Sequence, residues 1–269
     1  MKLRELSAAL TAAGVEEADA EARILFQKLG RYSAVQILSS DPDLTHPDLS
    51  SAIDHRKAGK PLAYILGETD FYNESYLVTP DVLIPRADTE ILVDYAVRHL
   101  PKNAVFADLC TGSGCIAVSV LANRPDTRAI AVDLSEKALA IAEKNAERNG
   151  VSSRITFLKK NVLSPFTIPK CDAILSNPPY IESKIVPQLS REVLCEPSIA
   201  LDGGEDGLDF YRTMLTYLPS LLTPDGSILF EIGYDQKAAI IALAEEVDLS
   251  CEVKRDFGGN PRVAILRKR

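Results

Sequence analysis

The 269-residue chain has little positive charge and no extended cluster of it. Its 30 Lys and Arg stand against 38 Asp and Glu, the formal net charge is −8, and the longest basic run is the terminal Arg267–Arg269. Proteins that wrap a phosphate backbone usually present a basic face. The composition therefore argues against nucleic acid as a direct substrate.

Cysteine and histidine are too scattered to suggest a metal site or a disulfide framework. The 5 cysteines never stand in Cys-x-x-Cys spacing, and the 3 histidines lie away from the motifs described below. We expect no metal and a reduced, cytoplasmic compartment. No continuous apolar stretch indicates a signal peptide or reaches the length of a membrane span, so no membrane partner is expected.

The residue pattern changes twice along the chain. Residues 1–63 are predicted to form a small domain of short helices, because apolar residues recur there at helical spacing. Residues 64–84 are rich in aromatic and β-branched residues around a turn at Asn73–Glu74, which predicts a β-hairpin linker. Residues 85–269 alternate strand-like and helix-like segments, and this predicts an α/β domain with a parallel sheet.

The end of the chain departs from that alternation. Two strand-like segments flank Phe257-Gly-Gly-Asn-Pro. A parallel pairing needs a crossover of about a dozen residues, so this short turn predicts that the last strand runs antiparallel to its neighbour. A doubly wound, Rossmann-like sheet with an antiparallel C-terminal strand is typical of class I methyltransferases. Because this is an analogy of fold, function must be argued from the site.

A glycine loop follows the first predicted strand of the large domain. A dinucleotide fingerprint would require glycines at 110, 112 and 115, but cysteines stand at 110 and 115, so a pyrophosphate site is not expected. The loop resembles the Asp-x-Gly-x-Gly-x-Gly loop of methyltransferases, which implies S-adenosyl-L-methionine as cofactor; a β–α turn without a ligand is the alternative. The candidate cofactor-binding residues here are Asp108, Cys110, Thr111, Gly112, Ser113 and Gly114.

Three further candidates follow the next two strands. Asp133 lies 19 residues past Gly114 and ends the second strand. An acid at this place can accept both ribose hydroxyls of an adenosine, or it can merely precede the helix cap Ser135. Asn161 and Val162 follow the third strand, where the fold contacts adenine, although methyltransferases often carry an acid at the position of Asn161.

The fourth strand ends at Asn177-Pro178-Pro179-Tyr180, beside the glycine loop. The nitrogen of an amide or exocyclic amine is a poor nucleophile, because its lone pair is delocalised. The Asn177 side-chain oxygen and the Pro178 carbonyl could accept its two N–H groups and orient it for attack. The prolines would hold these acceptors rigidly, and Tyr180 would offer an apolar wall. A plain Asn-Pro turn is the alternative.

Five sequence blocks together resemble the HemK/PrmC family, the glutamine N5-methyltransferases of peptide chain release factors. The resemblance spans residues 60–269 by motif, and the helical N-terminal region matches the layout of the family. Cys110, Ala87 and Asn161 depart from the usual residues. The blocks cover residues 82–90, 108–114, 176–181, 196–212 and 257–262.

The resemblance implies methyl transfer to the glutamine of the Gly-Gly-Gln motif in release factors by a monomer. Asn177, Pro178, Pro179 and Tyr180 would bind the substrate, and Asn177 would also border the cofactor. Arg86 would either face the cleft or only begin a helix. Residues 1–63 would help to dock the release factor, or would simply cap the larger domain.

Two other functions remain open at this point. A nucleic-acid amino-methyltransferase acting on adenine, cytosine or ribosomal RNA guanine should carry a basic groove or an added recognition domain. A non-catalytic S-adenosylmethionine-binding protein should have a degraded Asn-Pro-Pro-Tyr segment, whereas here it is intact.

Overall fold

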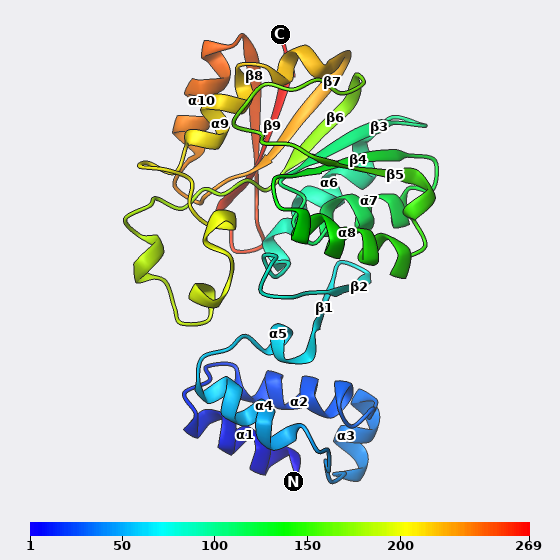
Figure 1. Ribbon diagram of the computed structural model, residues 1–269, viewed down its shortest axis with the longest axis vertical. Coiled ribbons are helices and arrows are strands. Elements are labelled where there is room, and N and C mark those ends of the chain that lie inside the picture. The colour runs from blue at the N-terminus through cyan, green and yellow to red at the C-terminus, as the bar shows by residue number, and fades with distance from the viewer. The chain divides into compact units, whose positions relative to one another are not determined.

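The computed structural model describes residues 1–269, and the chain divides into two compact units. Unit 1 comprises Met1–Gly67 and Ser190–Cys195, and unit 2 comprises Glu68–Leu189 and Glu196–Arg269 (Figure 1). The boundary expected after residue 63 falls within a short helix, α5 (Leu62–Leu66), which ends at Gly67 with a φ of +74°. Glycine adopts this left-handed conformation without strain, so the helix ends at Gly67. The boundary between the two units also lies at Gly67, which is later than expected.

Unit 1 is helical, as expected. Its core is formed by apolar side chains that recur at helical spacing, among them Leu6, Leu10, Leu25 and Phe26, all fully buried. One helix has no such periodicity and begins instead with a capping box, in which Ser33 accepts from the Gln36 backbone. The helices are α1 (Leu3–Ala12), α2 (Ala18–Lys28), α3 (Ala34–Ser40), α4 (Leu49–Lys57) and α5.

A buried arginine holds the distant segment Ser190–Cys195 in unit 1. The Arg56 side chain is 1% exposed and forms ion pairs with Glu21 and Glu192, each at 2.7 Å. It also donates to the Lys60 carbonyl at 2.7 Å. Because a buried guanidinium is costly without partners, these contacts explain why a segment that follows the Asn-Pro-Pro-Tyr corner packs among the N-terminal helices.

Unit 2 begins with a two-stranded antiparallel hairpin of β1 (Glu68–Phe71) and β2 (Glu74–Leu77). The hairpin confirms the expected element, but its turn is Tyr72–Asn73 rather than Asn73–Glu74. Glu74 pairs with Phe71 in the ladder, and Tyr72 adopts a φ of 57° in the turn.

The core of unit 2 is a seven-stranded sheet in the order β5-β4-β3-β6-β7-β9-β8. β9 runs antiparallel to both of its neighbours, which confirms the expected doubly wound sheet with an antiparallel last strand. β7 includes Pro224 and Gly226, because a register shift against β6 lies between the pairs Cys171–Leu222 and Ala173–Ser227. The strands are β3 (Val105–Leu109), β4 (Arg128–Asp133), β5 (Ile155–Lys159), β6 (Cys171–Ser176), β7 (Leu222–Glu231), β8 (Leu249–Arg255) and β9 (Pro261–Lys268).

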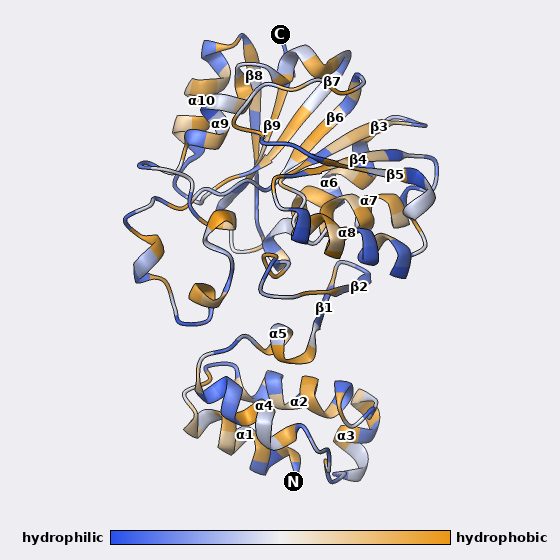
Figure 2. Ribbon diagram, in the orientation of Figure 1, coloured by the Kyte–Doolittle hydropathy of each residue, from blue (hydrophilic) through white to orange (hydrophobic).

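Helices cover both faces of this sheet (Figure 1). Phe106 and Leu175 pack under one set of helices, whereas Ala107 and Ile174, their neighbours in sequence, pack under the other. This alternation gives strands that are apolar on both faces, as their orange colour shows in Figure 2. The first set is α6 (Glu90–His99), α7 (Cys115–Asn123) and α8 (Glu136–Arg148); the second is α9 (Asp209–Leu215) and α10 (Lys237–Glu246). None of the helices combines the length and apolar character that crossing a membrane requires.

Candidate active site

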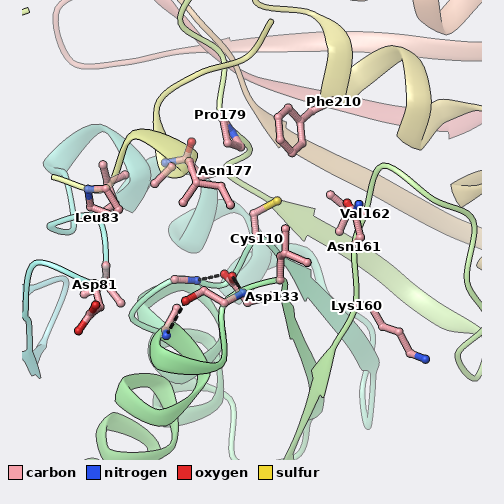
Figure 3. A pocket seen from close by; sticks show the side chains of 18 of the residues that line it. Asp81, Leu83, Cys110, Asp133, Lys160, Asn161, Val162, Asn177, Pro179 and Phe210 are labelled. Carbon is pink, nitrogen blue, oxygen red and sulfur yellow. Dashed lines mark hydrogen bonds between the residues drawn. The ribbon is translucent and has the colours of Figure 1, made fainter. Parts of the chain in front are cut away.

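A cavity of about 210 Å³ opens at the carboxyl ends of the central strands of unit 2 (Figure 3). Parallel strands bring their carboxyl ends to the same edge of a sheet, so the loops that follow β3, β4, β5 and β6 meet there. The predicted site residues that line the cavity are Cys110, Gly112, Asp133, Asn161, Val162, Asn177 and Pro179. The other predicted residues lie behind this lining or beside it.

The glycine loop between β3 and α7 turns through three left-handed residues. Cys110, Gly112 and Gly114 have φ values of 59°, 55° and 81°. A side chain at Gly114 would also place its Cβ 3.0 Å from the Cβ of Ala142, so glycine is required there on both counts. At Cys110 the chain adopts a conformation that costs a non-glycine residue about 1 kcal/mol. The departure from glycine at 110 therefore leaves the turn in place.

Asp108 lies beneath the loop rather than in the cavity lining. It is fully buried, and its Oδ2 accepts from the Thr111 hydroxyl at 2.5 Å and from the Ala117 backbone at 3.2 Å. Its Oδ1 has no hydrogen-bond partner. Burial raises the pKa of Asp108 to about 7. In this arrangement Asp108 supports the loop from below. Thr111, Ser113 and Gly114 are part of the loop but do not line the cavity.

Asp133 lies in the cavity lining, and it also precedes the helix cap Ser135. Its two oxygens accept from the Gly112 and Ser135 backbone N–H groups, each at 2.9 Å (Figure 3). Ser135 is also the side-chain cap of α8, accepting from Ala138. Burial raises the pKa of Asp133. Each carboxylate oxygen can accept a further hydrogen bond, so bracing the loop leaves capacity for a ligand hydroxyl.

Asn161 and Val162 line the cavity after β5. The Asn161 side-chain oxygen accepts from the Leu163 backbone at 2.9 Å, which fixes a tight turn. The Val162 carbonyl accepts from the Tyr217 hydroxyl at 2.9 Å. This segment is thus held by hydrogen bonds on both sides and presents one polar and one apolar side chain to the cavity.

The Asn-Pro-Pro-Tyr corner follows β6 at the cavity, but only two of its four side chains line it. Asn177 and Pro179 line the cavity, while Pro178 is buried behind them. The Tyr180 hydroxyl donates to Glu231 at 3.3 Å, so this side chain is tied to β7 and is not part of the lining.

Gly203 passes close behind the corner. A Cβ added to Gly203 would lie 2.7 Å from the Cα of Tyr180, and the Gly203 N–H donates to the Ile181 carbonyl at 2.8 Å. The Tyr180 carbonyl accepts from Gln236 at 3.1 Å. The loop that contains Gly203 and Gly204 therefore shapes the corner by close backbone approach.

Two polar residues behind the corner were not identified from the sequence. Thr89 and Glu231 are 2% and 1% exposed. The Asn177 amide nitrogen donates to the Thr89 hydroxyl at 3.2 Å, and this hydroxyl lies 2.6 Å from the Glu231 carboxylate. An acid at the end of the apolar run Ile228-Leu-Phe-Glu231 was the available signal, because a charged residue in a buried strand needs partners.

Arg86 is paired with a buried carboxylate and does not line the cavity. Its guanidinium forms an ion pair with Glu196, whose side chain is 2% exposed. The other Glu196 oxygen accepts from the Ile84 backbone at 3.0 Å. The pair joins the segment before α6 to the loop after the corner, so a contact between Arg86 and substrate stays a prediction.

The fold and the site together are those of a methyltransferase. The family described as "Methyltransferase small domain" matches residues 88–230, and that described as "PrmC N-terminal domain" matches residues 2–67. The solved ribosomal protein methylase of Lactobacillus delbrueckii subsp. bulgaricus shares the fold, with a TM-score of 0.52, 23% identity and coverage of 71% of this chain and 84% of that one.

Relatives in sequence narrow the class to one family. The release factor glutamine methyltransferase of Moorella thermoacetica is 38% identical over 97% of this chain and 95% of its own. That of Geobacter sulfurreducens is 37% identical over 93% and 89%. The chain belongs to the release factor glutamine methyltransferase family, which confirms the resemblance drawn from its motifs.

Proposed function

We propose that this chain transfers a methyl group from S-adenosyl-L-methionine to the side-chain amide nitrogen (N5) of the glutamine in the Gly-Gly-Gln motif of peptide chain release factors. The observation that carries the proposal is that Asn177, Gly112 and Asp133 line one cavity. The first belongs to the corner suited to a planar nitrogen, and the others belong to the loop and strand end suited to a nucleoside. Names of the relatives supply the substrate class.

The cavity residues fit S-adenosylmethionine, which supplies a methyl group activated by a sulfonium. Asp133 retains acceptor capacity for ribose hydroxyls, because its present bonds use only part of its lone pairs. The left-handed loop at Cys110 and Gly112 lets the backbone approach a ligand closely. Asn161 and Val162 would contact the adenine at the β5 end of the cavity.

The corner would act on the substrate glutamine by orientation and charge stabilisation. The Asn177 oxygen and the Pro178 carbonyl would accept the two N–H groups of the amide and direct its lone pair into the cavity. Positive charge develops on that nitrogen during alkylation, and the two acceptors stabilise it. An alkylated amide is strongly acidic, so its extra proton passes to water without a strong base.

Unit 1 would help to dock the release factor. Support comes from α3, where Val35 and Leu38 are 73% and 70% exposed. Exposed apolar side chains one helical turn apart are suited to a protein partner. Replacing both with glutamate should raise KM for the release factor about tenfold or more while leaving S-adenosylmethionine binding unchanged. An unchanged KM would remove α3 from the docking surface.

Labelled S-adenosylmethionine tests the function directly. The protein would be offered a release factor, the same factor lacking its Gly-Gly-Gln glutamine, tRNA, ribosomal RNA and DNA. We expect label only in the intact release factor. Asn177→Ala should slow the transfer about a hundredfold with cofactor binding retained, while Asn73→Ala, on the hairpin turn, should not. Label confined to nucleic acid would overturn the proposed function.

A further inference from the structure

We propose that Thr89 and Glu231 are positioning residues that turn the Asn177 amide so that its oxygen, and not its nitrogen, faces the cavity. The consequence for catalysis rests on the function proposed above, whereas the orientation itself does not. The three side chains form a continuous chain of hydrogen bonds from the cavity into the sheet.

Thr89 occupies a helix N-cap position but does not cap the helix with its side chain. It ends the short helix η1 (Ala87–Thr89) and stands at the N-cap position of α6, yet its side chain makes no capping hydrogen bond. A threonine at this position usually caps its own helix. Here the hydroxyl is directed instead to Glu231 at 2.6 Å and to the Asn177 nitrogen at 3.2 Å.

The donor and acceptor roles in this series of hydrogen bonds follow from the chemistry of the three side chains. An ionised carboxylate can only accept, so the Thr89 hydroxyl must donate its single proton to Glu231. The Thr89 oxygen can then only accept from its other neighbour. The Asn177 atom that meets it must therefore be the NH₂ group, which leaves the amide oxygen for the cavity. A second donor, the Tyr180 hydroxyl, meets the other Glu231 oxygen at 3.3 Å and also favours its ionised form.

Protonation of Glu231 would reverse the donor and acceptor roles in these hydrogen bonds. A carboxylic acid can donate to the Thr89 oxygen, which frees the threonine proton to donate to the Asn177 oxygen and draws that oxygen away from the cavity. Burial raises the pKa of Glu231 to about 7, and the Thr89 hydrogen bond and the Arg262 charge oppose the rise. The titratable and charged groups that face Glu231 are Asp88, Cys115, Tyr180, Tyr211 and Arg262.

Removal of the hydroxyl tests the positioning role. Thr89→Val has nearly the same shape and should lower kcat on the glutamine substrate about tenfold or more, with KM for S-adenosylmethionine unchanged. Thr89→Ser should recover most of the loss, because it restores the hydroxyl. Thr127→Val removes another buried hydroxyl, which donates to the Arg124 backbone carbonyl, and should change kcat less than about twofold. Equal kcat for Thr89→Val and the parent would overturn the role in catalysis.

A second measurement needs no substrate. In ¹⁵N-labelled protein the side-chain NH₂ signal of Asn177, assigned by its loss in Asn177→Asp, should shift with pH around a midpoint near 7. Thr89→Val and Glu231→Gln should each abolish this shift, whereas Asp108→Asn should keep it. An NH₂ signal that does not change with pH in the parent, or that still titrates in Glu231→Gln, would overturn the proposal that Thr89 and Glu231 orient the Asn177 amide. A titrating signal in a protein that methylates no glutamine would instead sink only the proposed function.

Discussion

Asp108→Asn should remove the pH dependence that this carboxyl imposes on the stability of unit 2. The carboxyl is fully buried under the glycine loop, and burial raises its pKa from 3.8 to about 7. A folded pKa above the unfolded value means that the folded state binds the proton more tightly. The contribution of this group to stability is therefore fully present below about pH 4 and is lost as the pH rises to about 7.

The size of the effect follows from the shift. A change of about 3 pKa units at about 1.4 kcal/mol per unit gives about 4 kcal/mol. Asparagine has no such titration, and its side-chain oxygen can still accept from Thr111 and Ala117. Its NH₂ group replaces the oxygen that has no partner, at a cost of about 1 kcal/mol. We expect the variant to be less stable than the parent at pH 4 and more stable at pH 8.

Urea unfolding of ligand-free protein at several pH values measures this difference. Near-ultraviolet circular dichroism follows unit 2, because Tyr32 and Tyr64 are the only 2 of the 9 tyrosines in unit 1. Titration of all other groups cancels when the parent is subtracted, and the exposed Asp225→Asn is the matched control for loss of one carboxyl. A difference between Asp108→Asn and the parent that changes by less than about 1 kcal/mol from pH 4 to pH 8 would refute the reasoning.

Two further predictions concern the glycine loop and the helical unit. Gly114→Ala should lower the unfolding free energy of unit 2 by about 3 kcal/mol, because of its φ of 81° and the 3.0 Å approach to Ala142, measured by urea unfolding. Gly112→Ala should cost only about 1 kcal/mol, because its Cβ would have 4.0 Å of space; equal costs would contradict this. Arg56→Met should destabilise unit 1 by about 3 kcal/mol, measured by hydrogen exchange, since it leaves Glu21 unpaired; exchange as slow as in the parent would contradict it.

Much of the site could be predicted because its parts are local in sequence. The glycine loop, Asp133 and the Asn-Pro-Pro-Tyr corner each follow a strand directly, and strands alternate with helices. In a parallel sheet this order alone brings them to one edge. The antiparallel β9 followed in the same way from the shortness of one turn.

The contacts behind the site could not be predicted in this way. Thr89 and Glu231 are 142 positions apart, and the turn residues near Thr89 say nothing about which buried acid will meet it. The same holds for Glu196, which pairs with Arg86 from 110 positions away. Sequence patterns report local conformation and periodicity, whereas pairings of this kind depend on how the sheet places its strand ends.

By itself, then, the sequence determined the class of fold, the position of the corner at a strand end and the family, because each of these is encoded in short runs of neighbouring residues. Tertiary structure alone decided that Asp108 supports the loop from below, that Tyr180 is tied to β7 and that Asn177 is held by Thr89. The physical reason is burial: a polar side chain removed from water must find its partner nearby in space, wherever that partner lies in the chain.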